Sequence, residues 1–170
     1  MQIRLTVNGK PVRADVTPRT SLADFLREAL NLTATHLGCE HGICGACTVT
    51  LNGQPVRACL TLAVACDGYE VRTLEGLRTD EIMLALRDAF HRHHGLQCGF
   101  CTPGMLVSAR DLIQRGKADS DSEIRKGLSG NICRCTGYTD IVRSVRKAAE
   151  ALSEADKVRP PSGNVSTVPA

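Results

Sequence analysis

The chain has 170 residues, enough for one ordinary domain or two small ones, and it carries nine cysteines, no tryptophan, two tyrosines and three phenylalanines. Two domains so poor in aromatic side chains would have marginal cores, so bound metal is expected to help hold them together. The formal net charge of +3 is nearly balanced and no basic block is interleaved with aromatic residues, which argues against nucleic-acid binding.

The first residues predict a β-hairpin. Apolar and polar residues alternate over residues 3–7 and again over 12–16, and Asn8-Gly9 between them is a strong turn signal. Residues 50–58 nearly repeat residues 6–14, which we interpret as one turn type used twice.

Because the chain opens on a strand instead of a signal peptide, and no apolar run approaches the ~20 residues of a membrane span, we expect a cytoplasmic protein without a membrane span. In that reducing compartment disulfides are rare, so the cysteines are expected to bind metal.

One helix and further strands complete the first 75 residues. Ser21 and Asp24 form a capping box for a helix. The apolar face of that helix comprises Leu22, Phe25, Leu26 and Ala29. A glycine-rich loop follows over residues 36–47, and strands are predicted at 48–51 and 69–73.

Past Gly76 the pattern changes to helices. Four helices are predicted, with starts at Thr79, Thr102-Pro103, Ser120 and about Ile141. We therefore expect an α+β chain with a first domain at residues 1–75 and a helical domain at residues 80–155. Residues 156–170 lack periodicity and are predicted to be disordered.

Four cysteines in the first half have the spacing of a plant-type [2Fe–2S] site. They are Cys39, Cys44, Cys47 and Cys59, in the pattern C-x4-C-x2-C with the fourth cysteine further along. Three thiolates from one short loop must wrap a compact cluster. The glycines of this loop permit the tight backbone and bring amide groups near the sulfurs. We expect Cys59 to lie on a strand.

A zinc site is the alternative for these four thiolates. Zinc knuckles usually pair two short Cys turns, whereas here three cysteines share one loop and the fourth stands alone, so the spacing favours an iron–sulfur cluster. His36 and His41 lie nearby, as histidine ligands of a Rieske centre would. Because all four thiolate positions are filled, we interpret both histidines as surface residues.

Four more cysteines form a second quartet, which comprises Cys98, Cys101, Cys133 and Cys135. Cys101 directly precedes the predicted helix start at Thr102-Pro103, where free amides and the helix dipole favour an anionic group. Cys133 and Cys135 lie in a loop between two predicted helices. Two loops at one end of a helical domain can therefore hold a second [2Fe–2S] cluster.

Cys66 and three histidines are left over. Cys66 lies in an apolar stretch and is expected to be a small buried side chain, with ligation in place of Cys59 as the weaker alternative. His91 and His94 would share one side of a helix as metal ligands do. An exposed polar helix end is the more common role for them and for His93.

Three segments together resemble a known family. They are residues 38–48 with the first three cysteines, Gln97-Cys98-Gly99-Phe100-Cys101-Thr102-Pro103-Gly104, and Gly130-Asn131-Ile132-Cys133-Arg134-Cys135-Thr136-Gly137-Tyr138. In this order they are similar to the motifs of the small iron–sulfur subunit of the molybdenum hydroxylases. That group includes xanthine dehydrogenase, aldehyde oxidoreductase and carbon monoxide dehydrogenase. The resemblance covers about residues 1–155.

The resemblance implies an N-terminal β-grasp plant-type ferredoxin domain followed by a C-terminal four-helix [2Fe–2S] domain. It also implies an electron-transfer subunit of an oxidoreductase. A large partner subunit would bind molybdopterin, often as its cytosine dinucleotide, and a medium subunit would bind FAD, in a dimer of heterotrimers. Electrons would pass singly from molybdenum to the cluster of the helical domain, then to the plant-type cluster, and then to FAD or another acceptor. The chain has no dinucleotide fingerprint, so we expect neither a catalytic residue nor a substrate pocket in it.

The resemblance also implies a contact with the pterin. In the family, the residue before the first cysteine of the second quartet and the last cysteine of that quartet lie against the pterin. Here these residues are Gln97 and Cys135. The amide of Gln97 can both donate hydrogen bonds to a heterocycle edge and accept them from it.

Two other functions compete with this one. A free two-cluster ferredoxin would shuttle between partners, but such shuttles tend to be acidic, whereas this chain is mildly basic. A zinc-stabilised adaptor would have no redox activity and no visible absorption bands.

Overall fold

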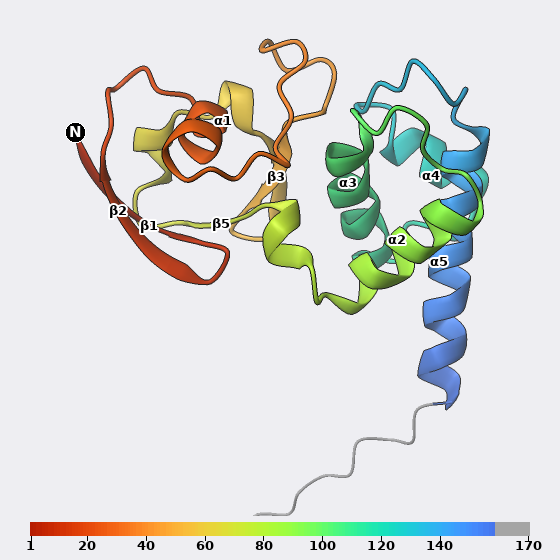
Figure 1. Ribbon diagram of the computed structural model, residues 1–170. Helices are drawn as coiled ribbons and strands as arrows, with labels where there is room; N and C mark the ends of the chain where they lie inside the picture. The colour runs from red at the N-terminus through yellow and green to blue at the C-terminus, as the bar shows by residue number, and fades with distance from the viewer. Residues whose placement is uncertain (159–170) are drawn as a thin grey trace, which may run out of the picture.

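A five-stranded mixed sheet forms the first half of the chain in the computed structural model, which describes residues 1–158 (Figure 1). Its strands are β1 (Gln2–Val7), β2 (Lys10–Asp15), β3 (Thr48–Leu51), β4 (Gln54–Arg57) and β5 (Glu70–Arg72). They lie in the order β2-β1-β5-β3-β4, and β5 runs parallel to β1 and antiparallel to β3. The last strand in sequence therefore joins the two hairpins at the centre of the sheet.

Both hairpins have the same tight turn. Asn8 and Gly9 have φ values of 52° and 77°, and Asn52 and Gly53 have φ values of 47° and 79°. Two successive residues with positive φ define the type I′ turn, whose twist matches that of paired strands. The predicted hairpins and the repeated turn are both confirmed.

The helix after Ser21 differs from the predicted one in its last turn. Asp24 donates its backbone N–H to the Ser21 hydroxyl at 3.0 Å, as a capping box requires. After α1 (Leu22–Asp24), however, the backbone continues as a π-helical turn over Phe25–Ala29. The wider turn rotates Ala29 out of the apolar face, so this residue is exposed and its predicted burial is wrong.

The second half is helical, as expected, and the α+β class is confirmed. Its helices are α2 (Glu81–Arg92), α3 (Thr102–Gln114), α4 (Asp121–Gly127) and α5 (Thr139–Val158). The predicted tail at 156–170 lies, from residue 159 on, outside the described residues. Within residues 1–158 there is no helix of the length and apolar character that crossing a bilayer requires.

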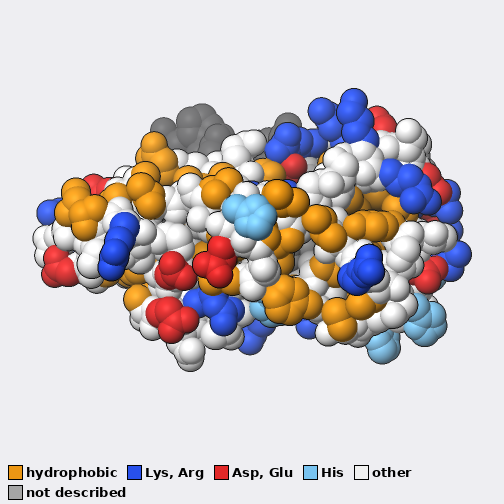
Figure 2. Space-filling model, turned by 90° about the horizontal axis from the view of Figure 1, so that it is seen from above, with side chains coloured by type: hydrophobic (Ala, Val, Ile, Leu, Met, Phe, Trp, Pro, Cys, Tyr) orange, Lys and Arg blue, Asp and Glu red, His pale blue; other side chains and the backbone are white. Residues whose placement is uncertain are grey.

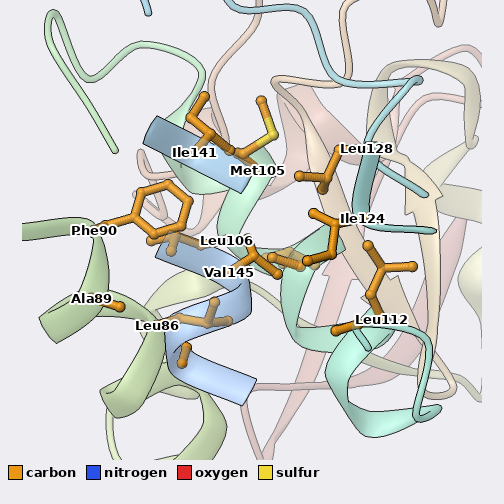
Figure 3. Close-up of a cluster of buried hydrophobic side chains, with 14 of the residues drawn as sticks. Leu86, Ala89, Phe90, Met105, Leu106, Leu112, Ile124, Leu128, Ile141 and Val145 are labelled. Atoms are coloured by element: carbon orange, nitrogen blue, oxygen red, sulfur yellow. The ribbon is translucent and has the colours of Figure 1, made fainter. Parts of the chain in front are cut away.

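Each half has its own hydrophobic core. In the first half, Ile3, Leu22, Phe25 and Leu26 pack between the sheet and α1. In the second half, Leu86, Phe90, Met105 and other apolar side chains fill the space between the helices (Figure 3). Two small cores, each with few aromatic side chains, leave the arrangement of the two halves to contacts between them.

The halves meet where the N-terminal part of α3 lies against β3 and the loop before it (Figure 1). Gly104, in the first turn of α3, is buried against the backbone of Gly45 and Ala46. A Cβ atom at Gly104 would collide with the carbonyl oxygen of Gly45. Only glycine therefore permits this close approach of helix and loop.

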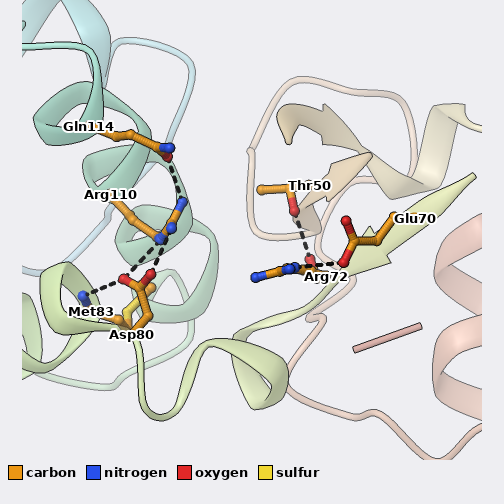
Figure 4. A network of polar contacts seen from close by, with 7 residues as sticks. All are labelled: Thr50, Glu70, Arg72, Asp80, Met83, Arg110 and Gln114. Carbon is orange, nitrogen blue, oxygen red and sulfur yellow. Dashed lines mark hydrogen bonds and ion pairs between the residues drawn. The ribbon is translucent and has the colours of Figure 1, made fainter. Parts of the chain in front are cut away.

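Asp80 holds the start of the helical half in place (Figure 4). Its carboxylate accepts the backbone N–H of Met83 at 3.0 Å, so Asp80, and not the predicted Thr79, caps α2. The same carboxylate takes two hydrogen bonds from the Arg110 guanidinium of α3, at 2.7 and 2.9 Å. Although burial acts to raise the pKa of Asp80, the Arg110 hydrogen bonds hold it below its usual value.

Two substitutions of Asp80 should distinguish its role as the cap of α2 from its role as the ion-pair partner of Arg110. Asp80→Ala removes both the cap and the ion pair and should lower the free energy of unfolding by about 2 kcal/mol, whereas Asp80→Asn keeps a good cap and should cost about half as much. Urea midpoints of the full chain measure both. Because the pKa of Asp80 is lowered in the folded state, its ionic contribution is present above the ordinary carboxyl pKa and is lost in more acidic solution. The cost of Asp80→Asn should therefore shrink below about pH 4. If both variants lose the same free energy of unfolding at neutral pH, the cap and the ion pair do not contribute separately and the prediction is wrong.

Candidate metal centres

The first cysteine quartet lies on two neighbouring segments of the sheet domain. Cys39 and Cys44 belong to the loop before β3, and Cys47 is buried where that loop enters the strand. Cys59 lies in a 3-10 turn directly after β4, so the expectation that it lies on a strand is wrong. Ala58 still donates its N–H to the Cys47 carbonyl at 3.2 Å, as a paired strand would, but Thr61 then donates its N–H to the Ala58 carbonyl at 3.4 Å and closes the turn. Cys59 lies in this turn beside Cys47.

Backbone amides surround the sulfur of Cys39. The N–H of Cys44 lies 3.3 Å from that sulfur, and the amides of His41 and Ile43 also donate to it. These hydrogen bonds stabilise the thiolate and lower the pKa of Cys39 to about 6. The loop is therefore built to hold negative charge, as an iron–sulfur site requires.

The second quartet lies at one end of the helical half. Cys101 is the N-cap residue directly before α3, and Cys98 is exposed in the preceding loop. Cys133 and Cys135 lie in the loop between α4 and α5, and the sulfur of Cys135 is 3.5 Å from that of Cys98. In Figure 1 these loops and the Cys39–Cys47 loop are at the same end of the molecule.

Polar groups also surround Cys133. The hydroxyl of Thr136 lies 3.2 Å from the Cys133 sulfur, and the Tyr138 hydroxyl accepts the backbone N–H of Cys133 at 2.9 Å. Although burial acts to raise the pKa of the Cys133 thiol, hydrogen bonds from the side chain and backbone of Thr136 hold it below its usual value. The second site thus resembles the first in supplying donors to a sulfur.

The eight thiols are arranged in pairs. The pairs are Cys39 with Cys44, Cys47 with Cys59, Cys98 with Cys135, and Cys101 with Cys133. Burial, followed by the neighbouring thiol, raises the pKa of Cys59 to about 11 and that of Cys101 to about 12. Each pair therefore brings two sulfurs into contact with each other.

This pairing can be compared with the ligand demands of zinc and of an iron–sulfur cluster. Structural zinc needs four ligands around a single ion. In a [2Fe–2S] cluster each iron takes only two protein ligands, so two pairs per site fit the cluster. The buried hydroxyl of Thr102, next to Cys101, has no protein partner among the described residues and leaves a donor free beside the second site.

The remaining cysteine and the histidines mostly lie where they were expected. Cys66 is fully buried, its sulfur contacts the Leu62 carbonyl at 3.5 Å, and burial raises its pKa. His91 and His94 are exposed. His36 is different, because its ring stacks on Phe100 with centroids 4.9 Å apart and its Nδ1 lies 2.7 Å from the Phe100 carbonyl oxygen. His36 therefore joins the two cysteine loops instead of only lying on the surface.

The contacts that join the two sites are not predicted by the sequence pattern. Ile132 donates its N–H to the carbonyl of Cys44 at 2.9 Å, and the buried Asn131 donates its side-chain amide to Gly45 at 3.1 Å. Arg57 donates to the carbonyl of Gly130 at 2.7 Å. The one signal in the sequence was Gly130-Asn131 just before the second cysteine loop, and it did not identify a partner 86 residues away.

Exposed apolar side chains surround both sites. Figure 2 views the molecule from the end that carries the cysteine loops, and hydrophobic side chains gather along this face. Ile43 and Leu60 are 59% and 63% exposed beside the first site, and Phe100 and Ile132 are 50% and 47% exposed beside the second. Large apolar side chains left in water around a site are typical of surfaces that meet another protein.

Two protein-family models match the chain. One, described as a 2Fe-2S iron-sulfur cluster binding domain, matches residues 5–73. The other, described as a [2Fe-2S] binding domain, matches residues 73–146. The two matches meet at residue 73, and each includes one complete cysteine quartet.

Curated relatives and solved structures are similar over nearly the whole chain. Caffeine dehydrogenase subunit gamma from Pseudomonas sp. (strain CBB1) is 51% identical, over 86% of this chain and 90% of the relative. The nicotine 6-hydroxylase small subunit of Paenarthrobacter nicotinovorans is 49% identical, over 87% and 89%. A chain of quinoline 2-oxidoreductase from Pseudomonas putida 86 superposes with a TM-score of 0.84 at 50% identity and covers 91% of this chain and 96% of that chain.

Two cysteine variants test the assignment of the first quartet. Cys59→Ser should damage the first site, because it removes one thiol of a pair, and iron and sulfide content should fall toward half. Cys66→Ala, the matched control, removes a small buried group and should cost on the order of 1 kcal/mol of stability with both sites intact. Iron analysis and visible absorption of the purified full chain measure the outcome. Loss of the first site in Cys66→Ala but not in Cys59→Ser would mean that the ligands are assigned wrongly.

Proposed function

The chain belongs to the family of small iron–sulfur subunits of the molybdenum hydroxylases, and we propose on this basis that its paired thiols hold two [2Fe–2S] clusters. The ligands of the first are Cys39, Cys44, Cys47 and Cys59, and those of the second are Cys98, Cys101, Cys133 and Cys135. The observation that carries the proposal is the arrangement of these thiols in four pairs. When bound, each cluster takes up and gives up one electron at a time.

The chain is the electron-transfer subunit of an oxidoreductase complex. Its partners are a large subunit with molybdopterin and a medium subunit with FAD. Two clusters suit this task because a two-electron oxidation at molybdenum must be drained in single steps. The chain's own residues do not act on substrate; they hold the clusters, set the charge around them and exclude water from the inner thiols.

We extend the proposal to the architecture and location of the chain. A β-grasp ferredoxin domain at residues 1–75 and a four-helix domain at 80–155 are supported by the two separate cores. The proposed location is the cytoplasm, a reducing compartment in which the thiols stay available as ligands. The assembly is proposed to be a dimer of heterotrimers.

The outer thiols of the second site are proposed to face the molybdopterin subunit. Cys98 and Cys135 are exposed, whereas their partners Cys101 and Cys133 are half-buried. Gln97 is exposed next to Cys98, so its amide is free to hydrogen-bond to a pterin edge, and Cys135 can contact the pterin while it holds iron. The exposed Phe100 and Ile132 beside this site would be covered by the same subunit.

The first site is proposed to face the acceptor. Ile43 and Leu60 are exposed beside it. An apolar rim that is covered by the FAD subunit would remove water between donor and acceptor. Electrons then enter beside Gln97 and leave beside Leu60.

A nitrogen heterocycle is the first substrate class to test. The relatives reported above carry names that refer to caffeine, nicotine and quinoline, each of which contains a nitrogen ring. We propose the same class for the complex that contains this chain, with the substrate bound on the large subunit.

Metal analysis and EPR of the purified full chain test the cluster proposal. The protein should contain about four iron and about four acid-labile sulfide, and after reduction it should show two distinguishable EPR signals. Removal of iron with a chelator should abolish both signals and lower stability, because metal binding in small domains is coupled to folding. Zinc in place of iron, or one signal with about two irons in a fully loaded preparation, would contradict the proposal.

Gln97→Ala in the assembled complex tests the pterin contact. Cluster content should stay normal, because Gln97 is not a ligand. Reduction of the second site by substrate should slow by about tenfold, or molybdenum occupancy should fall, because outer contacts to a metal centre typically contribute that much. Stopped-flow absorption and molybdenum analysis measure the two effects. Unchanged kinetics with full molybdenum would show that Gln97 has no part in the contact.

A further inference from the structure

A backbone hydrogen bond connects the two cysteine sites. Ile132 donates its N–H to the carbonyl oxygen of Cys44 at 2.9 Å. Cys44 is a proposed ligand of the first cluster, and Ile132 directly precedes Cys133, a proposed ligand of the second. One hydrogen bond thus connects the covalent chains of two ligands that belong to different sites.

Arg57 closes a ring of hydrogen bonds around this connection. Its guanidinium donates to the Thr48 hydroxyl at 2.6 Å and to the Gly130 carbonyl at 2.7 Å. Thr48 in turn donates its hydroxyl to the carbonyl of Gly45 at 2.6 Å. Gly45 also accepts the side-chain amide of Asn131, which follows Gly130 in the chain. The ring therefore links Gly45, which follows Cys44, to Asn131, which precedes Ile132, and it encloses the Ile132–Cys44 hydrogen bond.

The ring lies in a buried and closely packed region. Thr48 and Asn131 are buried, and the Ser108 hydroxyl of α3 donates to the Asn131 side-chain carbonyl at 2.9 Å. A Cβ atom at Gly45 would collide with the Gly130 carbonyl oxygen, so the two loops touch backbone to backbone. Loss of one member would leave a buried acceptor without its donor, which costs more than the bond itself contributes.

Arginine suits this position better than another cation. Its planar fork donates in two fixed directions at once, here toward the strand β3 and toward the loop before Cys133. A lysine ammonium is a single point charge and would satisfy the two acceptors less well. The positive charge also lies between two sites that are built to hold negative charge.

We propose that Arg57 is a positioning residue for electron transfer between the two cluster sites. It clamps the Gly130 carbonyl and thereby keeps the Ile132 amide in its hydrogen bond with the Cys44 carbonyl. In the step that it supports, one electron leaves the second site and arrives at the first, and no proton or atom is transferred. This inference rests on the proposed function, because it requires both sites to be loaded.

Arg115 provides a matched control. It too is an arginine that joins the two halves, because its guanidinium donates to Gln54 of β4 at 3.3 Å and pairs with Asp111 of its own helix. It has no contact with either cysteine loop among the interactions of the described residues. Arg115→Gln therefore removes a cation and a contact between the halves without touching the connection.

The test compares Arg57→Gln, Arg57→Lys and Arg115→Gln in the assembled complex. One electron is delivered by a flash-generated deazaflavin radical, and freeze-quench EPR follows its redistribution between the two signals. We expect Arg57→Gln to slow redistribution by at least about tenfold and to narrow the magnetic splitting between the fully reduced sites. Arg57→Lys should show a smaller change of both quantities, and Arg115→Gln should match the wild type.

Several outcomes separate the possibilities. If Arg57→Gln keeps both signals but redistributes its electron at the wild-type rate with the wild-type splitting, the proposal is wrong. If Arg57→Gln loses iron, the test rests on Arg57→Lys instead. A wild-type redistribution rate and a wild-type splitting in Arg57→Lys would then overturn the proposal as well. If Arg115→Gln slows redistribution and narrows the splitting as much as Arg57→Gln does, the effect comes from contact between the halves in general, and the proposal is wrong. A wild-type protein without two signals would instead refute the proposed function itself.

Discussion

The direct backbone contact between the two cysteine loops is the constraint on which the rest of the structure depends. Gly45 touches both Gly130 and Gly104, and no side chain separates the first cysteine loop from the start of α3 or from the loop before Cys133. Two half-size cores could pack against each other in many ways, because apolar contacts have little directional preference. Glycines at the contact and hydrogen bonds around it select one arrangement. That arrangement places Ile132, the residue before Cys133, in a hydrogen bond with Cys44.

The burial of the thiols follows from the same contact. Cys47 is buried and Cys101 and Cys133 are half-buried, near the seam between the halves, whereas Cys98 and Cys135 are exposed at the outer end. A carrier needs a protected interior for transfer between its own sites and an open end for transfer with a partner. The exposed Phe100 and Leu60 beside the two sites give each end an apolar surface for a subunit to cover. One packing arrangement therefore leaves some thiols protected and others open to a partner.

Local patterns were enough to predict most of the fold and the identity of the candidate ligands. The Asn-Gly turns, the capping boxes at Ser21 and Ser120 and the proline at the start of α3 depend on contacts between residues within one turn of the chain, so their sequence signals are direct. Cysteine spacing is likewise a local property, since three thiolates from one loop can wrap a cluster only at certain separations. The sequence by itself therefore determined the α+β class and two cysteine quartets.

Tertiary structure decided what lies between those local elements. The π-helical turn that exposes Ala29 and the 3-10 turn that places Cys59 beside Cys47 arise from packing that no local pattern records. The pairing of Cys98 with Cys135 and of Cys101 with Cys133 joins residues more than thirty positions apart in the chain. The ring through Arg57, Gly45 and Asn131 joins three distant segments, and each of its members is an ordinary polar or small residue in the sequence. Such contacts depend on how the two halves pack against each other. No periodicity or spacing within a single sequence predicts that packing.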